Sequence, residues 1–165
     1  MAKHEYSFKA QENMAKAVGV DLSISQKNAI EIANKIRGKN VETAKRLLED
    51  TANHVRPIPV RRYTEGAGHR SGLGPAKFFD NASTQILGLL NSAIANAQSK
   101  GLASGKLEIV HINAHRGSNI PRRGRHSRRK MKRAHVEIVL REELTNKKGI
   151  ADNKNIKGQK LKVKK

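Results

Sequence analysis

The sequence predicts an α+β fold: three helices packed on a small antiparallel sheet, with a long protruding β-hairpin and a basic C-terminal tail. Three observations support this prediction. Apolar residues recur at helical spacing in three separate segments. The stretches 107–114 and 134–140 alternate in the manner of strands. Residues 116–133 between them, called the finger below, hold nine Arg or Lys and no carboxylate. The two strands are therefore expected to carry a cationic loop outward.

The N-terminal part predicts one short strand and two helices. Residues 4–9 place Tyr6 and Phe8 on one side of the possible strand. Ser25 is expected to cap a helix that stops at Gly38, and Asn40 a second helix directly after it. Because the link is so short, we expect the two helices to pack against each other. The inward residues are Ala29, Ile32, Ala33 and Ile36, then Val41, Ala44, Leu47 and Leu48.

Residues 54–79 differ in kind from the rest of the chain. They contain three Pro and four Gly, a density that interrupts both helices and strands. Their basic residues face a single acid, Glu65. We therefore expect a long basic loop that a partner orders.

The third helix is expected to begin at Asp80 or Asn81 and to close at Gly101. Its spacing is the most regular in the chain. The apolar face consists of Ile86, Leu90, Ala93, Ile94 and Ala97.

The hairpin is expected over about 106–142. Arms of roughly 15 residues reach ~50 Å, far beyond the ~15 Å radius of a compact chain of this length. The distal half must therefore project. In the first strand, Leu107, Ile109 and His111 are expected on one side, with Val110, Ile112 and Ala114 on the other. In the return strand, Val136, Ile138 and Leu140 alternate with His135, Glu137 and Val139.

The excess of basic residues indicates which class of partner the protein binds. The 34 Lys and Arg outnumber the 14 Asp and Glu, giving a formal net charge of +20. Repulsion on this scale disfavours a compact free chain, so a polyanionic partner is expected. A membrane is a poor candidate, because no stretch approaches the ~20 apolar residues needed to span one. No secretion signal is expected at the first residues either.

Residues 1–143 are expected to form one domain, followed by a disordered basic tail over 144–165, which has no apolar periodicity. The chain has no cysteine, which rules out thiolate zinc sites. Its few aromatic residues favour phosphate contact over base stacking. In the finger, Arg outnumbers Lys by seven to two, and the planar guanidinium suits paired phosphate oxygens. We interpret the finger as a nucleic-acid-binding segment.

Other kinds of site have little support. The stretch 66–74 lacks the Gly-Lys-Ser/Thr triplet of a P-loop. On a strand, His111 and His115 would lie ~13 Å apart, and with no carboxylate beside them no metal is expected. These histidines are expected to bond RNA or solvent. The carboxylates are scattered, so neither enzyme activity nor a cofactor is expected.

Three blocks of sequence stand out together. They are 25–28 continuing through 36–39, Asn91-Ser-Ala-Ile-Ala-Asn-Ala97, and Pro121-Arg-Arg-Gly-Arg125 followed by Lys132-Arg-Ala-His-Val-Glu-Ile138. With them the chain resembles the universal large-subunit ribosomal protein twenty-two family in its archaeal and eukaryotic form. The stretches 60–63 and 68–70 resemble the insertion that separates this form from the bacterial one. The resemblance covers roughly 6–143.

The resemblance implies a structural constituent of the large ribosomal subunit, in the cytoplasm, with no homo-oligomer expected. The hairpin would bridge several domains of the large-subunit ribosomal RNA. Its tip would line the nascent-peptide exit tunnel near large-subunit protein four and meet the nascent polypeptide transiently. The implied rRNA-binding residues are Arg61, Arg62, His69, Arg70, Lys77, Arg116, Arg122, Arg123, Arg125, Arg128, Arg129, Lys130, Lys132 and Arg133. The implied tunnel-tip residues are Ile120, Pro121, Arg122, Arg123, Gly124, Arg125 and His126.

Two alternatives stay open at this point. A nucleoid-type DNA-binding protein would share the charge and the arm, and Ile120-Pro121 would serve as its apolar wedge. It would also need a dimer face, which the sequence does not reveal. An RNA-modifying enzyme would need a cofactor or metal pocket, of which the sequence gives no sign.

Overall fold

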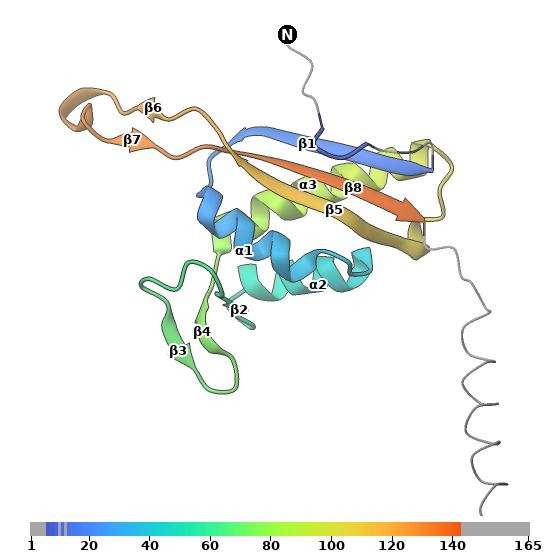
Figure 1. Cartoon of the computed structure of the whole chain (residues 1–165), viewed down its shortest axis with the longest axis horizontal. Coiled ribbons are helices and arrows are strands. Elements are labelled where there is room, and N and C mark those ends of the chain that lie inside the picture. Colours follow the sequence, from blue (N-terminus) through green and yellow to red (C-terminus); the bar gives the residue numbers. More distant parts are fainter. Residues whose placement is uncertain (1–5, 10, 12, 143–165) are drawn as a thin grey trace, which may run out of the picture.

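A three-stranded antiparallel sheet forms the centre of the protein (Figure 1). The computed structural model describes residues 6–9, 11 and 13–142, so the predicted tail lies outside the described residues. The strand order is β1-β8-β5, with β1 at Met14–Leu22, β5 at Leu107–Arg116 and β8 at Ala134–Glu142. The helices are α1 at Gln26–Ile36, α2 at Val41–Ala52 and α3 at Asp80–Ser99. The predicted α+β fold is confirmed.

The first two helices form where their apolar spacing predicted them. Gly38 ends α1 with a φ of +68°, a conformation that favours glycine. Asn40 caps α2 by accepting the N–H of Glu42 at 2.9 Å. Ser25 is the N-cap residue of α1, but its side chain makes no capping hydrogen bond. All the predicted inward residues are buried except Leu47, which is half-buried.

The expectation that α1 and α2 pack on each other was wrong. Helix α1 packs mainly on β5, and α2 mainly on α3. The link between the helices is itself bonded to the sheet: the N–H of Gly38 donates to the carbonyl of Ile109 at 2.8 Å. The N–H of Ile109 donates in turn to the carbonyl of Lys39 at 3.0 Å. This anchorage directs the two helices onto different partners.

Helix α3 covers β1 and β8, and the prediction of its position is confirmed. The predicted strand at 4–9 was wrong for its described part, because residues 6–9 are irregular. Strand β1 was not predicted from the sequence. Its buried residues include Ala15 and Ala17, and such small side chains give a weak alternation signal.

The core lies between the sheet and the helices. Leu107, Ile109, Ile112 and Ala114 of β5 all belong to it. The register shifts between Ile109 and His111, which is a β-bulge. The predicted alternation was therefore right up to Ile109 and reversed after it. On β8, Val136, Ile138 and Leu140 face the core as predicted.

Residues 54–79 are not the irregular loop that their Pro and Gly content predicted. They form a second, small antiparallel sheet in the order β2-β4-β3. Its side chains Ile58, Val60 and Ala76 join the main core, which explains how so polar a segment is held. The strands are β2 at Ile58–Pro59, β3 at Gly68–Arg70 and β4 at Gly74–Lys77.

Beyond the sheet, β5 and β8 continue as a narrow ribbon that projects from the body (Figure 1). A second pairing, of Ile120 with Met131 and Pro121 with Lys130, holds this ribbon together. The short elements here are β6 at Ile120–Pro121, η2 at Gly124–His126 and β7 at Lys130–Met131, with η1 at Ser104–Lys106 before β5.

Candidate nucleic-acid interface

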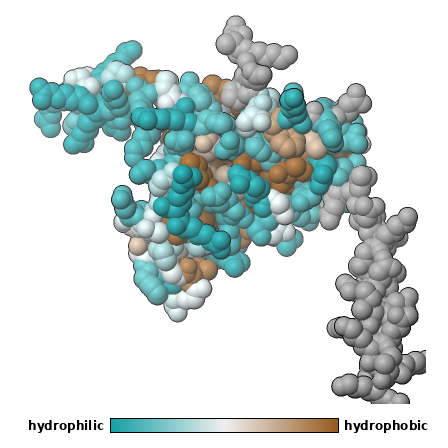
Figure 2. Space-filling model, in the orientation of Figure 1, coloured by the Kyte–Doolittle hydropathy of each residue, from teal (hydrophilic) through white to brown (hydrophobic). Residues whose placement is uncertain are grey.

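The tip of the finger is a closed turn that presents its cations to solvent. The N–H of Arg122 donates to the carbonyl of Arg129 at 2.9 Å, and Gly124 has a φ of +69°. Every residue from 121 to 130 is exposed. Figure 2 shows the projecting finger as largely hydrophilic. Of the predicted tip residues, Ile120 is an exposed apolar one, at 42%.

No finger cation forms a salt bridge with a carboxylate in the part of the chain that the structure describes. The positive charge of the tip is thus not neutralised by these residues. Like charges at such close spacing repel one another, and only an external anion relieves that repulsion.

The root of the finger is fixed by Asp21, at the end of β1. Its backbone N–H donates to Nδ1 of His135 at 3.0 Å, and its carbonyl accepts Nη1 of Arg133 at 3.2 Å. Its carboxylate accepts the hydroxyl of Ser118 at 3.4 Å. Next to it, the buried Gly117 donates its N–H to the carbonyl of Arg133 at 3.0 Å. The finger therefore leaves the sheet from an anchored base.

Of the predicted rRNA-binding residues in the segment 54–79, four are exposed and one is half-buried and hydrogen-bonded within the protein. Arg61, Arg62, His69 and Arg70 are exposed. Lys77 is half-buried, and its Nζ donates to the carbonyl of Glu65 at 3.2 Å. Lys77 thus holds the loop as well as adding charge, which its position in the sequence did not reveal.

Glu31 of α1 holds the segment that carries Arg61 and Arg62. This carboxylate is only 3% exposed. It accepts the backbone N–H groups of Arg61 at 3.2 Å, Arg62 at 2.9 Å and Tyr63 at 3.0 Å. Charge-assisted bonds of this kind are among the stronger ones in proteins. One buried acid thereby fixes the backbone that presents two exposed cations.

Four cations on and just after α1 were not among the residues predicted from the sequence. They are Lys27, Lys35, Arg37 and Lys39, and Glu31 is the only acid between the first and last of them. Lys35, Arg37 and Lys39 line a hollow together with Arg61, which follows β2. The sequence does contain a signal for them, because residues 27–39 hold four Lys or Arg and a single acid.

A cluster around Glu137 overturns one prediction. The carboxylate is 1% exposed, and its Oε1 lies 2.9 Å from Nε2 of His111 and 3.4 Å from Nε2 of His115. Ser7 donates its N–H to Oε2 at 3.1 Å and its hydroxyl to Oε1. The expectation that these histidines bond RNA or solvent and have no carboxylate beside them was therefore wrong.

The same contacts control the ionisation of Glu137. Burial by itself raises the pKa of a carboxyl group, because it disfavours the charged form. Here the hydrogen bonds from Ser7 and the two histidines outweigh burial and lower the pKa of Glu137 from 4.5 to about 2. The ring of Phe8 also stacks on His111, with centroids 5.2 Å apart. The cluster thus fastens the N-terminal segment onto the sheet face opposite the helices.

The described residues contain no group of three or more His, Cys, Asp or Glu able to hold a metal ion. None of the helices among them is both long and apolar enough to cross a membrane.

The chain is similar to known ribosomal proteins over most of its length. The family described as ribosomal protein L22p/L17e matches residues 17–141. A large ribosomal subunit protein uL22 from Staphylothermus marinus is 38% identical over 151 residues, covering 84% of this chain and 96% of the relative. One of the same name from Methanothrix thermoacetophila is 37% identical, covering 86% and 99%. One from Archaeoglobus fulgidus is 39% identical, covering 74% and 82%.

The matched region contains all three helices, the whole finger and most of the central sheet. Both a nucleoid-type DNA-binding protein and an RNA-modifying enzyme are thereby set aside. The chain belongs to the ribosomal protein L22p/L17e family, and it is a structural, non-enzymatic constituent of the ribosome.

Proposed function

We propose that the finger enters the folded RNA of the large ribosomal subunit, where its arms join several RNA domains and its tip lines the nascent-peptide exit tunnel. One observation supports this most: residues 121–130 are all exposed, carry no acid, and project from an anchored root. A segment of this charge and shape suits surroundings rich in phosphate. As a ribosomal constituent, the protein is located in the cytoplasm.

The proposed rRNA-contacting residues are the fourteen predicted from the sequence: five between Arg61 and Lys77, and nine between Arg116 and Arg133. Their contacts position RNA without reading its sequence, so specificity would come from the folded shape of the RNA. The proposed tip, 120–126, would face the nascent polypeptide transiently, with large-subunit protein four as a neighbour.

Co-sedimentation with large subunits tests this proposal. Neutralising about ten phosphates gives an affinity for large-subunit rRNA whose log-log salt slope is about −7 to −9. The double variant Arg122→Gln/Arg123→Gln should flatten that slope by about 0.7–0.9 per lost contact. A protein that leaves large subunits at low salt, or an affinity indifferent to salt, would count against the proposal.

The tunnel part of the proposal needs a separate measurement. A photoreactive residue placed at His126 should cross-link to a stalled nascent chain, whereas one placed at the exposed Lys45 of α2 should not. If the two positions label the nascent chain equally, the tip does not line the tunnel.

A further inference from the structure

We propose that the outer side of α1 binds a second stretch of RNA backbone, seated between two cationic hollows at the two ends of that helix. This inference rests on the proposed rRNA-binding function. It adds a site on the globular body that is separate from the finger tip. In this site Lys27, Lys35, Arg37 and Lys39, which are outside the fourteen predicted residues, join six that are among them.

The first hollow lies where the N-terminus of α1 meets the finger root. It has a volume of about 400 Å³, and no carboxylate lines it. Arg116, Lys130, Lys132 and Arg133 reach it from the finger, and Lys27 reaches it from α1. Five cations around one concave space, with no acid among them, make a binding site for an anion such as a phosphodiester.

The helix end adds to this hollow. Ser25 and Gln26 also line it, the Ser25 side chain makes no capping bond, and the first turn holds no acidic residue. The N–H groups of a first helical turn bind anions well, and the helix dipole favours negative charge there. The N-terminus of α1 thus offers N–H donors that the Ser25 side chain does not cap.

The second hollow lies toward the C-terminal end of α1. Its volume is about 310 Å³, and its cations are Lys35, Arg37, Lys39 and Arg61. Glu31 is its only carboxylate, and three backbone N–H groups already occupy that side chain. Nη2 of Arg37 donates to the carbonyl of Ile112 at 2.7 Å, which holds this guanidinium in place.

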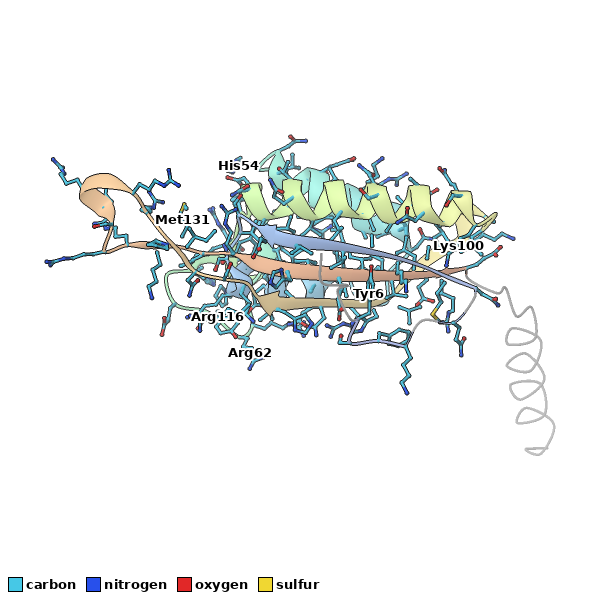
Figure 3. The ribbon with its side chains drawn as sticks, turned by 90° about the horizontal axis from the view of Figure 1, so that it is seen from above. Tyr6, His54, Arg62, Lys100, Arg116 and Met131 are labelled. Atoms are coloured by element: carbon cyan, nitrogen blue, oxygen red, sulfur yellow. The ribbon has the colours of Figure 1, made fainter. Side chains whose placement is uncertain are left out.

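Two cations around Tyr63 relate the hollows to each other: Lys27 lines the first hollow, and Arg62 directly follows Arg61, which lines the second. Nζ of Lys27 lies 5.2 Å from the ring centroid of Tyr63, and the guanidinium carbon of Arg62 lies 5.5 Å from it. The half-buried ring therefore holds two exposed cations beside α1. In Figure 3, Arg62 and Arg116 lie along the β5 edge of the sheet, and α3 lies along the opposite edge, next to β1.

The spacing suits a polymer better than a single ion. From Lys27 to Lys35 the helix rises about 12 Å, a distance that a few nucleotides cover at ~3.4 Å each. A free phosphate would fill one hollow and leave the other empty. The first hollow also shares its cations with the finger root, so RNA that surrounds the finger passes directly into it.

The test compares three charge-matched double variants by their affinity for a transcript of large-subunit rRNA at several salt concentrations. The α1 variant is Lys27→Gln/Lys35→Gln, and the finger reference is Arg122→Gln/Arg123→Gln. The control is Lys45→Gln/Arg46→Gln, which removes two exposed charges from α2. The α1 variant should flatten the salt slope by about one unit per lysine, as the finger reference does. The control should leave the slope unchanged, and all three should keep the wild-type melting temperature.

A second readout is independent of the variants. Adding a short oligouridylate to the ¹³C,¹⁵N-labelled wild-type protein should shift the amide resonances of Gln26 and Lys27 and the ring resonances of Tyr63. If the finger reference flattens the salt slope while the α1 variant leaves it unchanged, as the control does, the inference fails and the proposed function stands. If the wild type does not bind the transcript, both fail. If polyglutamate shifts the same resonances as strongly as the oligouridylate, the α1 surface binds acidic protein, and the inference is overturned.

Discussion

Nε2 of His111 on β5 lies 2.9 Å from Oε1 of Glu137 on the neighbouring strand β8. The β-bulge between Ile109 and His111 sets the register of the two strands at this point. The contact gives a buried carboxylate a hydrogen-bond donor on the side of the sheet that the helices leave uncovered. It belongs to the cluster that fastens Ser7 and Phe8, and so it couples the N-terminal segment to the central strand.

The free energy of unfolding should depend on pH through Glu137. Because folding lowers the pKa of this group from 4.5 to about 2, its stabilising contribution is fully present above pH 4.5 and is lost as the pH falls toward 2. The Glu137→Gln variant should be less stable at neutral pH, by on the order of 3 kcal/mol, and should lose less stability between these two pH values. Urea unfolding at a series of pH values measures this. Glu65→Gln, which changes an exposed carboxylate, should follow the wild type, and equal pH dependence of Glu137→Gln and wild type would contradict the assignment.

Replacing Glu31 should loosen the segment that presents Arg61 and Arg62. In Glu31→Gln, an amide NH₂ would face backbone N–H groups that now donate to a carboxylate, and we expect a cost of about 1–3 kcal/mol. Hydrogen exchange at the amides of residues 61–63 should accelerate more than exchange in the core of α3. Glu42→Gln makes the same chemical change at an exposed position of α2, and it should leave those amides protected. Unchanged protection of these amides in Glu31→Gln would show that the segment keeps its structure without the carboxylate.

A side chain at Gly117 should disturb the root of the finger. A Cβ there would lie 2.9 Å from Cβ of Arg133, 3.0 Å from its carbonyl carbon and 2.9 Å from Oδ1 of Asp21. Since part of this contact is backbone, the strands must shift, and Gly117→Ala should cost about 1–3 kcal/mol. Thermal unfolding measures the loss. Gly88→Ala is the control, because a Cβ there meets nothing within 4 Å in α3, and its melting temperature should stay the same or rise. A normal melting temperature for Gly117→Ala would mean that the root is not tightly packed.

The finger tip should be mobile in the free protein and become ordered on RNA. Its residues 121–130 are all exposed, so only the ribbon pairing and a few backbone hydrogen bonds of the turn hold them, without side-chain packing. The ¹⁵N heteronuclear NOE of Arg123 and Arg125 should be lower than that of buried residues of β8, and should rise when large-subunit rRNA is added. A rigid tip in the absence of RNA would speak against a segment that its partner orders.

The strength of each sequence prediction followed the strength of its local signal. Helix α3 was predicted at the right place because its apolar residues repeat over many turns, and the finger because a long acid-free run is visible without any structure. Strand β1 was missed because alanines alternate there with little contrast. The small sheet was missed because its Pro and Gly residues conceal a few core side chains such as Ile58 and Ala76.

The sequence by itself determined the helices, the charge and the cationic finger, because each depends on residues that are close together in the chain. Only the tertiary structure decided that Glu31 accepts hydrogen bonds from the backbone at 61–63. It also decided that Glu137 contacts two histidines and Ser7. It also decided that the N-terminus of α1 and the finger root share one hollow. These relationships join segments far apart in sequence, and they depend on a bulge and a strand order that no local pattern encodes.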